Sequence, residues 1–394
     1  MIQIEIFPAI NGDCFLIHTD EGLILIDCGY VSTYSSHLKP ALEKLNEQGK
    51  SILRFILTHI DEDHIQGAIK FLAENGNASN PQIIKIDQIW HNSYKHLQAE
   101  RADEKISSNA ESILKSSFKT IELQTEKQIS AKQGSSLAAL ILQNGYNWNN
   151  DFEGKAFSID HFPEVKVSEK IKFELLSPDD AALNRLEKYW RKELYKLGFR
   201  DKITKQAIFD DAFEFVLMND KIAPDETSSQ EISASDFDVE ELRKQSCVLD
   251  RTPKNGSSLA FILTVNDKKM LFLGDAIPSI VNEQLEKKLA SESKPVLFDL
   301  IKLSHHGSYA SNSPKLFEIT DARNYLVSTK GESSPHPSKA TLAWLVGRST
   351  ENLRKIYFNY ENSGYDVLNK QTLKTKYNYE VILSDQLSNR KITI

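Results

Sequence analysis

Short apolar runs separated by glycines occupy the first 60 residues of the chain. "IQIEIF" alternates apolar and polar positions, and "DCFLIHT", "GLILIDCGY" and "ILRFILTH" follow it. Such runs are typical of β-strands, and Gly12, Gly22 and Gly29 lie between them, where turns are expected. Behind the last run, "DHIQGAIKFLAENG" has helical spacing and predicts a helix that ends at Gly76.

The middle of the chain, residues 95–250, has a different pattern. "AESILKSSFKTIELQTEKQIS" and "DDAALNRLEKYWRKELYKLG" predict helices, and the strand-like "KIKFELLSPDD" interrupts them. Residues 223–242 are acidic, rich in serine and free of lysine and arginine, so we expect an exposed, mobile linker there. We therefore predict a single domain, 1–394, that carries a largely helical insertion over 95–250.

Strand character returns in the last third. "SSLAFILTVNDKKMLFLGD" predicts a hairpin that turns near Asn266 and Asp267, and "FDLIKLSHHGS" and "ARNYLVSTKG" follow. Several strands across the chain end on a carboxylate or an imidazole. These strand-end residues are Asp27, His59, Asp275 and the pair His305–His306.

The end of the fourth run holds the densest group of such residues, in the spacing His59-x-Asp61-x-Asp63-His64. A divalent cation needs several oxygen or nitrogen ligands that converge from separate segments, and loops after strands can supply them. With Asp275 and His305 added, the candidates exceed what one tetrahedral ion uses. The pattern therefore predicts two ions that share a bridging carboxylate and a hydroxide.

The His59-x-Asp61-x-Asp63-His64 spacing resembles the signature motif of the metallo-β-lactamase fold, with Asp61 in place of its second histidine. Further blocks resemble the metallo-β-lactamase-like domain of DNA-uptake channel proteins of the ComEC type. They are "NGDCFLI", "LILIDCG", "LTHIDEDHIQG", "NGSSLAFIL", "LFLGD", "LIKLSHHGS" and "STKGESSPHPS". The blocks cover both ends of the chain, whereas the helical middle has no recognised counterpart.

This resemblance implies an α/β fold, a four-layer αββα sandwich with the metals at one edge. It implies that His59 and Asp61 bind the first ion, that Asp275 bridges, and that the second ion is bound by Asp63, His64 and His305. A histidine usual before the bridging aspartate is missing, and "KNGSSLAF" offers Asn255, Ser257 or Ser258 instead. The first site is thus richer in oxygen, which favours Mn²⁺, with Zn²⁺ second and Mg²⁺ as a further candidate.

Four other residues are candidates for the surroundings of the metals. His306 is the alternative to His305 as a ligand and otherwise faces the substrate. His336, between two prolines, is either a surface histidine in a rigid turn or a proton donor to the leaving group. Asp27 is expected to orient a loop or a ligand, and Lys330 to contact the substrate.

Net charge, cysteine content and missing motifs argue against several classes of protein. The net charge of −7 gives no general attraction for nucleic acid, so contact with DNA needs a local basic patch. Three scattered cysteines, no basic leader and no long apolar run predict a cytoplasmic protein without a membrane segment. No GxSxG elbow or nucleotide-binding glycine loop occurs.

The sequence thus predicts a metallohydrolase that cleaves phosphodiesters, with DNA as the substrate, and in which Asp63 also orients the attacking water. The rival enzymatic hypothesis is hydrolysis of a small phosphodiester, a thioester or a lactone. A third hypothesis is a non-catalytic binding subunit that docks a protein partner through the helical middle.

Overall fold

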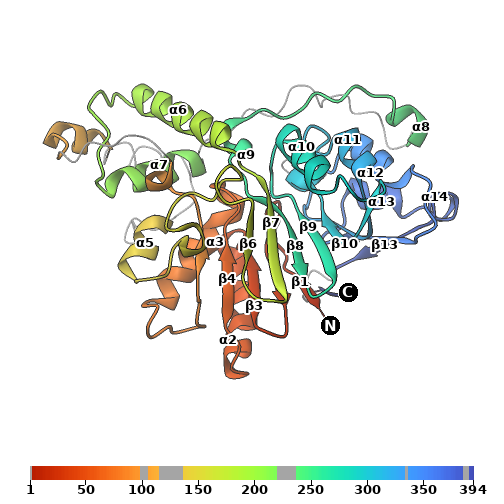
Figure 1. The fold of residues 1–394 in the computed structure, drawn as a ribbon, viewed down its shortest axis with the longest axis horizontal. Coiled ribbons are helices and arrows are strands. Elements are labelled where there is room, and N and C mark those ends of the chain that lie inside the picture. The colour runs from red at the N-terminus through yellow and green to blue at the C-terminus, as the bar shows by residue number, and fades with distance from the viewer. Residues whose placement is uncertain (1, 98–104, 115–135, 220–236, 333–335, 385–389) are drawn as a thin grey trace.

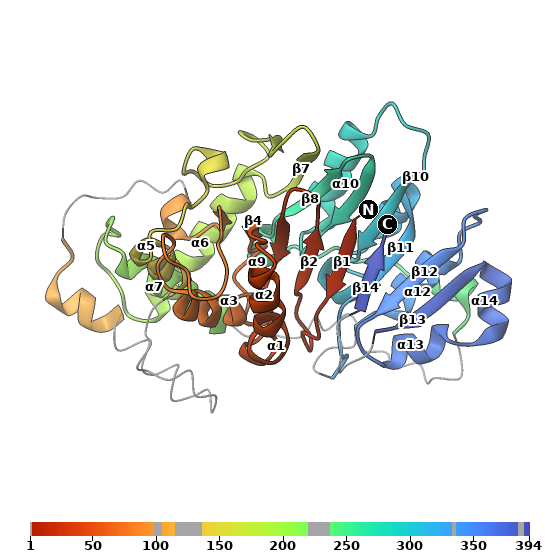
Figure 2. The same ribbon diagram turned by 90° about the horizontal axis from the view of Figure 1, so that it is seen from below.

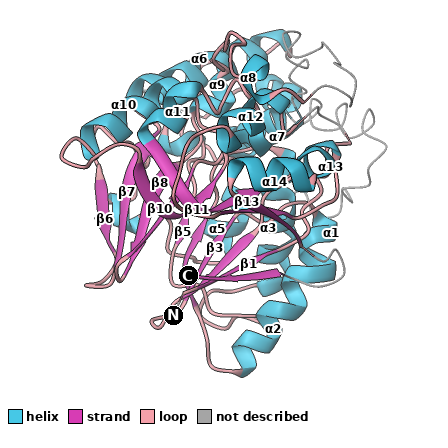
Figure 3. Ribbon diagram, turned by 90° about the vertical axis from the view of Figure 1, so that its right-hand side faces the viewer, coloured by secondary structure: helices cyan, strands magenta, loops and turns pink. Residues whose placement is uncertain are grey.

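The protein is built from two β-sheets packed against each other, with helices on both outer sides (Figure 1, Figure 3). It is described by a computed structural model, which covers residues 2–97, 105–114, 136–219, 237–332, 336–384 and 390–394. The predicted four-layer αββα sandwich is confirmed.

The first sheet joins the two ends of the chain. Its order is β14 (Arg390–Thr393), β1 (Gln3–Ile6), β2 (Phe15–His18), β3 (Leu23–Ile26), β4 (Ile52–Ile56) and β5 (Ile89–Trp90). The strand β14 pairs antiparallel with β1, so the two ends of the chain lie side by side (Figure 2). The strands β3, β4 and β5 are parallel, so their carboxyl ends meet at one edge.

The second sheet has eight strands. Its order is β13 (Tyr379–Leu383), β12 (Arg354–Phe358), β11 (Thr320–Val327), β10 (Val296–Lys302), β9 (Lys268–Phe272), β8 (Ala260–Val265), β7 (Ile171–Ser177) and β6 (Glu164–Lys166). The predicted hairpin is confirmed: β8 and β9 pair antiparallel, and Asn266 in their turn has φ +51°. The strands β9 to β13 run parallel.

Alternating side chains bind the layers together. In β3, Leu23 and Leu25 pack among the helices outside the first sheet, whereas Ile24 and Ile26 pack between the sheets. In β8, Ile262 likewise faces the outer helices of the second sheet, while its neighbours face inward. Because both faces of these strands are buried, their sequences are continuous apolar runs such as "LILI".

Helices cover the outer faces of both sheets. They are α1 (Val31–Thr33), α2 (Lys39–Glu47), α3 (Glu62–Asn75), α5 (Leu137–Gln143), α6 (Asp180–Lys196), α7 (Ile208–Asn219), α8 (Val239–Leu242), α9 (Pro253–Gly256), α10 (Pro278–Lys288), α11 (Pro314–Ile319), α12 (Lys339–Val346), α13 (Ser363–Leu368) and α14 (Gln371–Tyr377). Short 3-10 or π helical segments are η1 (Tyr34–Leu38), η2 (Tyr94–His96), η4 (Asn150–Phe152) and η6 (Ser304–Gly307).

The predicted helix before Gly76 is confirmed as α3, and Gly76 caps it with φ +67°. Among the described residues, none of the helices has the length and apolar character needed to cross a bilayer.

The region 95–250 combines helices with part of a sheet. It contributes α5, α6 and α7, but it also contributes β6 and β7, which extend the second sheet beside β8. Of the linker expected over 223–242, residues 223–236 lie outside the described part. Its last residues form α8, whose Val239 and Leu242 are buried against the outer face of the second sheet. The division into one domain and an insertion stays a prediction.

Gly12, in the loop between β1 and β2, lets that loop approach the start of α3. A β-carbon at Gly12 would stand 1.7 Å from the backbone oxygen of Asp63, closer than any real contact. At Gly256 an added β-carbon would meet its nearest atoms at 3.8 Å, an ordinary contact. Gly12 therefore sets the distance between these two segments.

We expect Gly12→Ala to lower the free energy of unfolding by about 1–3 kcal/mol, because backbone must move to admit the methyl group. Gly256→Ala is the matched control and should change it by less than about 0.5 kcal/mol. Urea unfolding of chelator-treated protein measures both, so that metal loss does not contribute. Equal effects of the two substitutions would contradict the steric argument.

Candidate metal centre

The candidate ligands lie in loops at one edge of the sandwich, where strands of both sheets end. The connection between β4 and α3 carries His59 and Asp61, and the first turn of α3 carries Asp63 and His64. The loop after β9 carries Asp275, and η6, which follows β10, carries His305 and His306. The sheets thus bring together residues more than 200 positions apart in the sequence.

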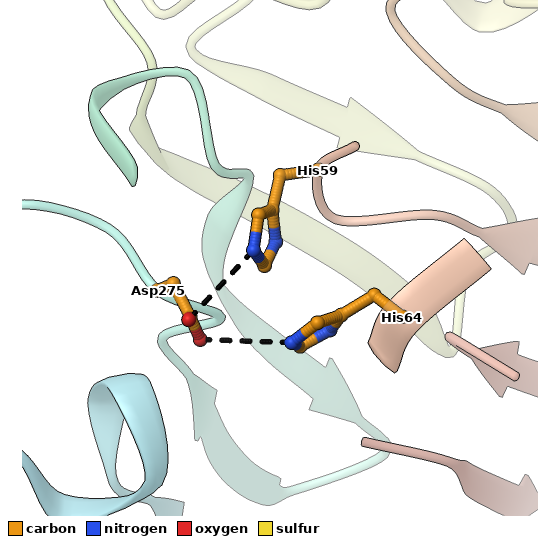
Figure 4. Close-up of side chains that lie close together, drawn as sticks. All are labelled: His59, His64 and Asp275. Atoms are coloured by element: carbon orange, nitrogen blue, oxygen red, sulfur yellow. Dashed lines mark ion pairs between the residues drawn. The ribbon is translucent and has the colours of Figure 1, made fainter. Parts of the chain in front are cut away.

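Asp275 is the centre of this cluster. Its Oδ2 lies 3.7 Å from His59 Nε2, and its Oδ1 lies 3.9 Å from His64 Nε2 (Figure 4). Both imidazoles and the carboxylate are almost fully buried. His59, His64 and Asp275 therefore form a three-donor group suited to a metal ion.

A second group shares His64 with the first. It consists of Asp63, His64 and His306, and His306 Nε2 lies 3.6 Å from Asp63 Oδ2 and 4.0 Å from Asp275 Oδ2. Two ligands at about 2.1 Å from one ion cannot be more than about 4.2 Å apart. Each of these donor pairs lies within that limit, so the spacing fits a divalent ion.

Three donor atoms at the centre have no hydrogen-bond partner among the described residues. They are Nε2 of His59, Nε2 of His64 and Oδ1 of Asp275. Beside them, Oδ1 of Asp61 likewise has no hydrogen bond among the described residues, but it has an ion pair with Lys254. A buried polar atom without a partner costs about 1–3 kcal/mol, so such atoms need a physical reason. A divalent ion bound here would coordinate them, and on this ground the residues fit a metal.

Hydrogen bonds on the other ring nitrogens aim the imidazoles. His64 Nδ1 lies 2.8 Å from Asp27 Oδ2, and His306 Nδ1 lies 2.8 Å from the Ser328 carbonyl. Thr58 donates its hydroxyl proton to Asp27, so that hydroxyl accepts from His59 Nδ1 at 3.0 Å. In the neutral rings all three Nε2 lone pairs are then free and face Asp275.

In the metal-free protein, neighbouring charges shift the pKa values of the candidate ligands. Burial lowers the pKa of His64, but Asp27 and Asp63 outweigh it and raise that pKa well above its usual value. Burial also lowers the pKa of His306, yet Asp275 and Asp63 raise it overall. For Asp275, burial raises the pKa, but the neighbouring histidines hold it well below its usual range. Without metal, these carboxylates therefore favour the protonated forms of His64 and His306.

Asp61 differs from the other predicted ligands. Its Oδ1 forms an ion pair with Lys254 Nζ at 2.7 Å, and its Oδ2 lies 3.5 Å from His59 Nε2. Burial raises the pKa of Asp61, but the Lys254 ammonium and His59 together lower it far below its usual value. Lys254 was not predicted from the sequence; its neighbours Asn255 and Ser257 were considered instead.

His305 and His306 have different environments. Asn255 donates to Asp250 at 2.6 Å, which fixes its Nδ2 near His305 Nδ1 at 3.4 Å. A donor facing Nδ1 leaves the proton of a neutral ring on Nε2, which lies 3.7 Å from Asp275. The geometry thus places His306, rather than the predicted His305, in the ligand group with Asp63 and His64.

The remaining predicted residues lie around the centre. Asn255 contacts Asp250, and Ser257 donates to the carbonyl of Lys254 at 2.6 Å, so both act within the α9 turn. Lys330 pairs with Glu332 at 2.7 Å. Asp27 bonds Thr58 and His64, as an orienting residue would.

His336 lies beside His305, with their ring centroids 5.2 Å apart. Burial, together with the charges of His305 and His306, lowers the pKa of His336 to about 3. The ring is therefore neutral at neutral pH and holds no imidazolium proton to give. The role of proton donor stays a prediction.

A buried ion pair between Asp13 and Lys302 was also not predicted from the sequence. Lys302 ends β10, and its ammonium pairs with Asp13, which lies 4.0 Å from His306 Nδ1. The signal was present, because a lysine in the apolar run "LIKLS" needs a buried partner. Ser258 was weighed only as a ligand, yet its Oγ accepts from the Asp275 backbone N–H at 3.0 Å.

Comparison with known proteins agrees with this arrangement. A model of the metallo-beta-lactamase superfamily matches residues 8–119, which include β2 to β5 and the His59–His64 segment. A search of curated proteins finds no match. The family match and the two-sheet sandwich with its ligand-bearing loops identify the metallo-β-lactamase fold.

Solved structures were compared as well. The metallo-beta-lactamase fold protein YhfI from Bacillus subtilis is 10% identical over 100% of both chains, with a TM-score of 0.39. A diphosphatase from the PhnP family is 10% identical over 100% of this chain and 98% of its own, with a TM-score of 0.37. Zn²⁺-bound PqqB from Methylobacterium extorquens is 8% identical over 100% of both chains, with a TM-score of 0.40. Likeness at this level adds nothing to the fold assignment.

We expect Asp27→Asn to weaken metal binding by about 10–100-fold, because the Asp27 carboxylate holds both Thr58 and His64. Isothermal titration of Mn²⁺ and of Zn²⁺ into chelator-treated protein measures the change. Asp20→Asn, at an exposed position, is the control and should bind as the wild type does. Unchanged affinity in Asp27→Asn would contradict the orienting role.

Metal affinity should rise with pH between about pH 6 and 8, because the raised pKa values of His64 and His306 mean that the ion displaces protons. Each proton released adds about tenfold in affinity per pH unit while the group is protonated. Titrations in two buffers of different ionisation enthalpy count the protons. An affinity that does not change with pH would show that these rings carry no protons in the metal-free protein.

Proposed function

We propose that this protein is a metal-dependent hydrolase of phosphodiesters and that DNA is its substrate. The observation that carries the proposal is the convergence of four histidine Nε2 atoms on the carboxylate of Asp275. Those of His59, His64 and His306 have free lone pairs in the neutral rings. Each ring is anchored through Nδ1, so the donors are held ready for an ion.

The accessibility of the centre supports catalysis over a purely structural metal. The side chains of His59, His64 and Asp275 are at most 3% exposed, whereas those of Asp63 and His305 are 21% and 31% exposed. The donors thus form a buried floor with an open side. Structural metal sites are closed, while catalytic sites keep a position for water or substrate.

A divalent ion bound at this floor would supply a hydroxide at neutral pH and polarise a phosphoryl oxygen. Asp275, His64 and His306 would hold it, and Asp27 and Ser328 would fix the two imidazoles. Asp63, on the open side, would also hold the attacking water through its carboxylate. Lys254 is buried at the same edge, where it forms an ion pair with Asp61.

Two features support a phosphodiester rather than another ester. Carboxylates make up much of the donor set, and such oxygen-rich sites suit Mn²⁺, which is therefore the favoured ion, with Zn²⁺ or Mg²⁺ next. The motif blocks, from "NGDCFLI" to "LIKLSHHGS", also resemble the corresponding domain of ComEC-type DNA-uptake proteins. That resemblance is the reason for naming DNA.

Incubation with Mn²⁺ and with single- or double-stranded DNA tests the proposal. We expect cleavage by the wild type and a loss of more than about 100-fold in Asp63→Asn, since a ligand should matter more than its outer partners. Asp267→Asn, in the exposed β8–β9 turn, is the matched control and should cleave normally.

Two results would contradict the proposal. No cleavage by metal-loaded wild type with Mn²⁺, Zn²⁺ or Mg²⁺ would exclude the nuclease and direct attention to small phosphodiesters, thioesters and lactones. Equal cleavage by wild type and Asp63→Asn would show that the activity does not come from this centre.

A further inference from the structure

Lys254 is placed where a second metal ion would need a ligand. It belongs to α9, directly before the "NGSS" segment that precedes β8, and it is 5% exposed. Its ammonium lies 2.7 Å from Asp61 Oδ1, and the other oxygen of Asp61 faces His59. The residue nearest to the first predicted metal position on this side is thus a cation without a lone pair.

The side chains of the neighbours of Lys254 form hydrogen bonds with other protein groups. Asn255 Nδ2 is held by Asp250 at 2.6 Å, and Ser257 donates its hydroxyl to the Lys254 carbonyl. Ser258 accepts from the backbone N–H of Asp275. The α9 turn therefore brings positive charge to the centre where the sequence was expected to bring an oxygen ligand.

The two donor groups also compete for one atom. His64 belongs to the group of His59 and Asp275 and to the group of Asp63 and His306, but its Nε2 has a single lone pair. With His64 committed to the second group and Asp61 paired with Lys254, the first group keeps His59 and the shared Asp275. His305 Nε2 also lies 3.7 Å from Asp275, but in the neutral ring it carries the proton when Asn255 donates to Nδ1. Protein sites for such ions usually supply at least three ligands.

The positive charge of Lys254 also disfavours binding of a second ion. At 2.7 Å from Asp61, the ammonium already neutralises the carboxylate that would attract the ion. An added divalent cation beside it would meet like charge in a buried setting, where repulsion is screened far less than in water.

We propose that the centre holds one divalent ion, bound by Asp63, His64, His306 and Asp275, and that the Lys254 ammonium takes the place of a second ion. Asp61 is then a partner of Lys254 and not a metal ligand. This inference rests on the proposed metal-dependent function and replaces the two-ion arrangement expected from the sequence.

Counting the bound ions tests the proposal without an activity assay. Chelator-treated protein is loaded with Mn²⁺ or Zn²⁺ and examined by native mass spectrometry, and the Mn²⁺ form also by electron paramagnetic resonance. We expect one ion per chain and the spectrum of an isolated Mn²⁺ rather than of an exchange-coupled pair. Two ions per chain in the wild type would overturn the proposal while leaving the hydrolase function intact; no ion at all would overturn both.

Two aspartates provide a matched comparison. Asp61→Asn should retain the ion with affinity within a few-fold of the wild type, whereas Asp63→Asn should lose at least about 10–100-fold. The two substitutions are chemically identical and two residues apart, so a general effect on folding would not separate them. Equal loss in both would make Asp61 a ligand and overturn the proposal.

Removing the ammonium should admit a second ion. Lys254→Ala frees Asp61, and Lys254→His adds an imidazole, so we expect a second, weaker ion in the former and a tighter one in the latter. Lys244→Ala, at an exposed lysine that pairs with Glu241, is the control and should keep one ion. A single ion in both Lys254 variants would show that the ammonium is not what excludes the second ion, and would overturn the inference.

Discussion

The buried carboxylate of Asp27 is the interaction on which the centre depends. It accepts the backbone N–H and the hydroxyl of Thr58 and the Nδ1–H of His64, all within 2.8 Å. It thereby ties the end of β3 to the end of β4 and to the first turn of α3. Because Thr58 in turn fixes His59, one buried charge orients two of the imidazoles that face Asp275.

The charge balance of the centre follows from its burial. Asp13 and Asp61 have lysine partners, Lys302 and Lys254, whereas Asp275 is surrounded by imidazoles. Buried carboxylates need compensating charge, because desolvation favours their neutral form. In the metal-free protein the raised pKa values of His64 and His306 favour protonated rings that supply such charge, and a divalent ion can exchange for those protons. The two lysines supply part of the cationic charge that these buried carboxylates need.

The arrangement of the sheets makes the centre possible. Parallel strands in both sheets end at the same edge, so that Asp27 and Thr58 follow neighbouring strands, as do Asp275 and η6. Gly12 allows the β1–β2 loop to lie against Asp63, and Ser328, which follows β11, accepts from His306 and donates to the Gly12 carbonyl. These contacts connect the two sheets across the site, so fold stability and ligand placement are linked.

The sequence by itself determined what depends on neighbours along the chain. Apolar periodicity located the strands of the first 60 residues, α3 with its Gly76 cap, and the β8–β9 hairpin, and the dense His59–His64 motif identified the candidate centre. Tertiary structure decided which of the adjacent His305 and His306 faces Asp63, that Lys254 reaches Asp61, and that β6 and β7 join the second sheet. Those outcomes depend on hydrogen bonds and ion pairs between segments far apart in the chain, whose directions no local pattern contains.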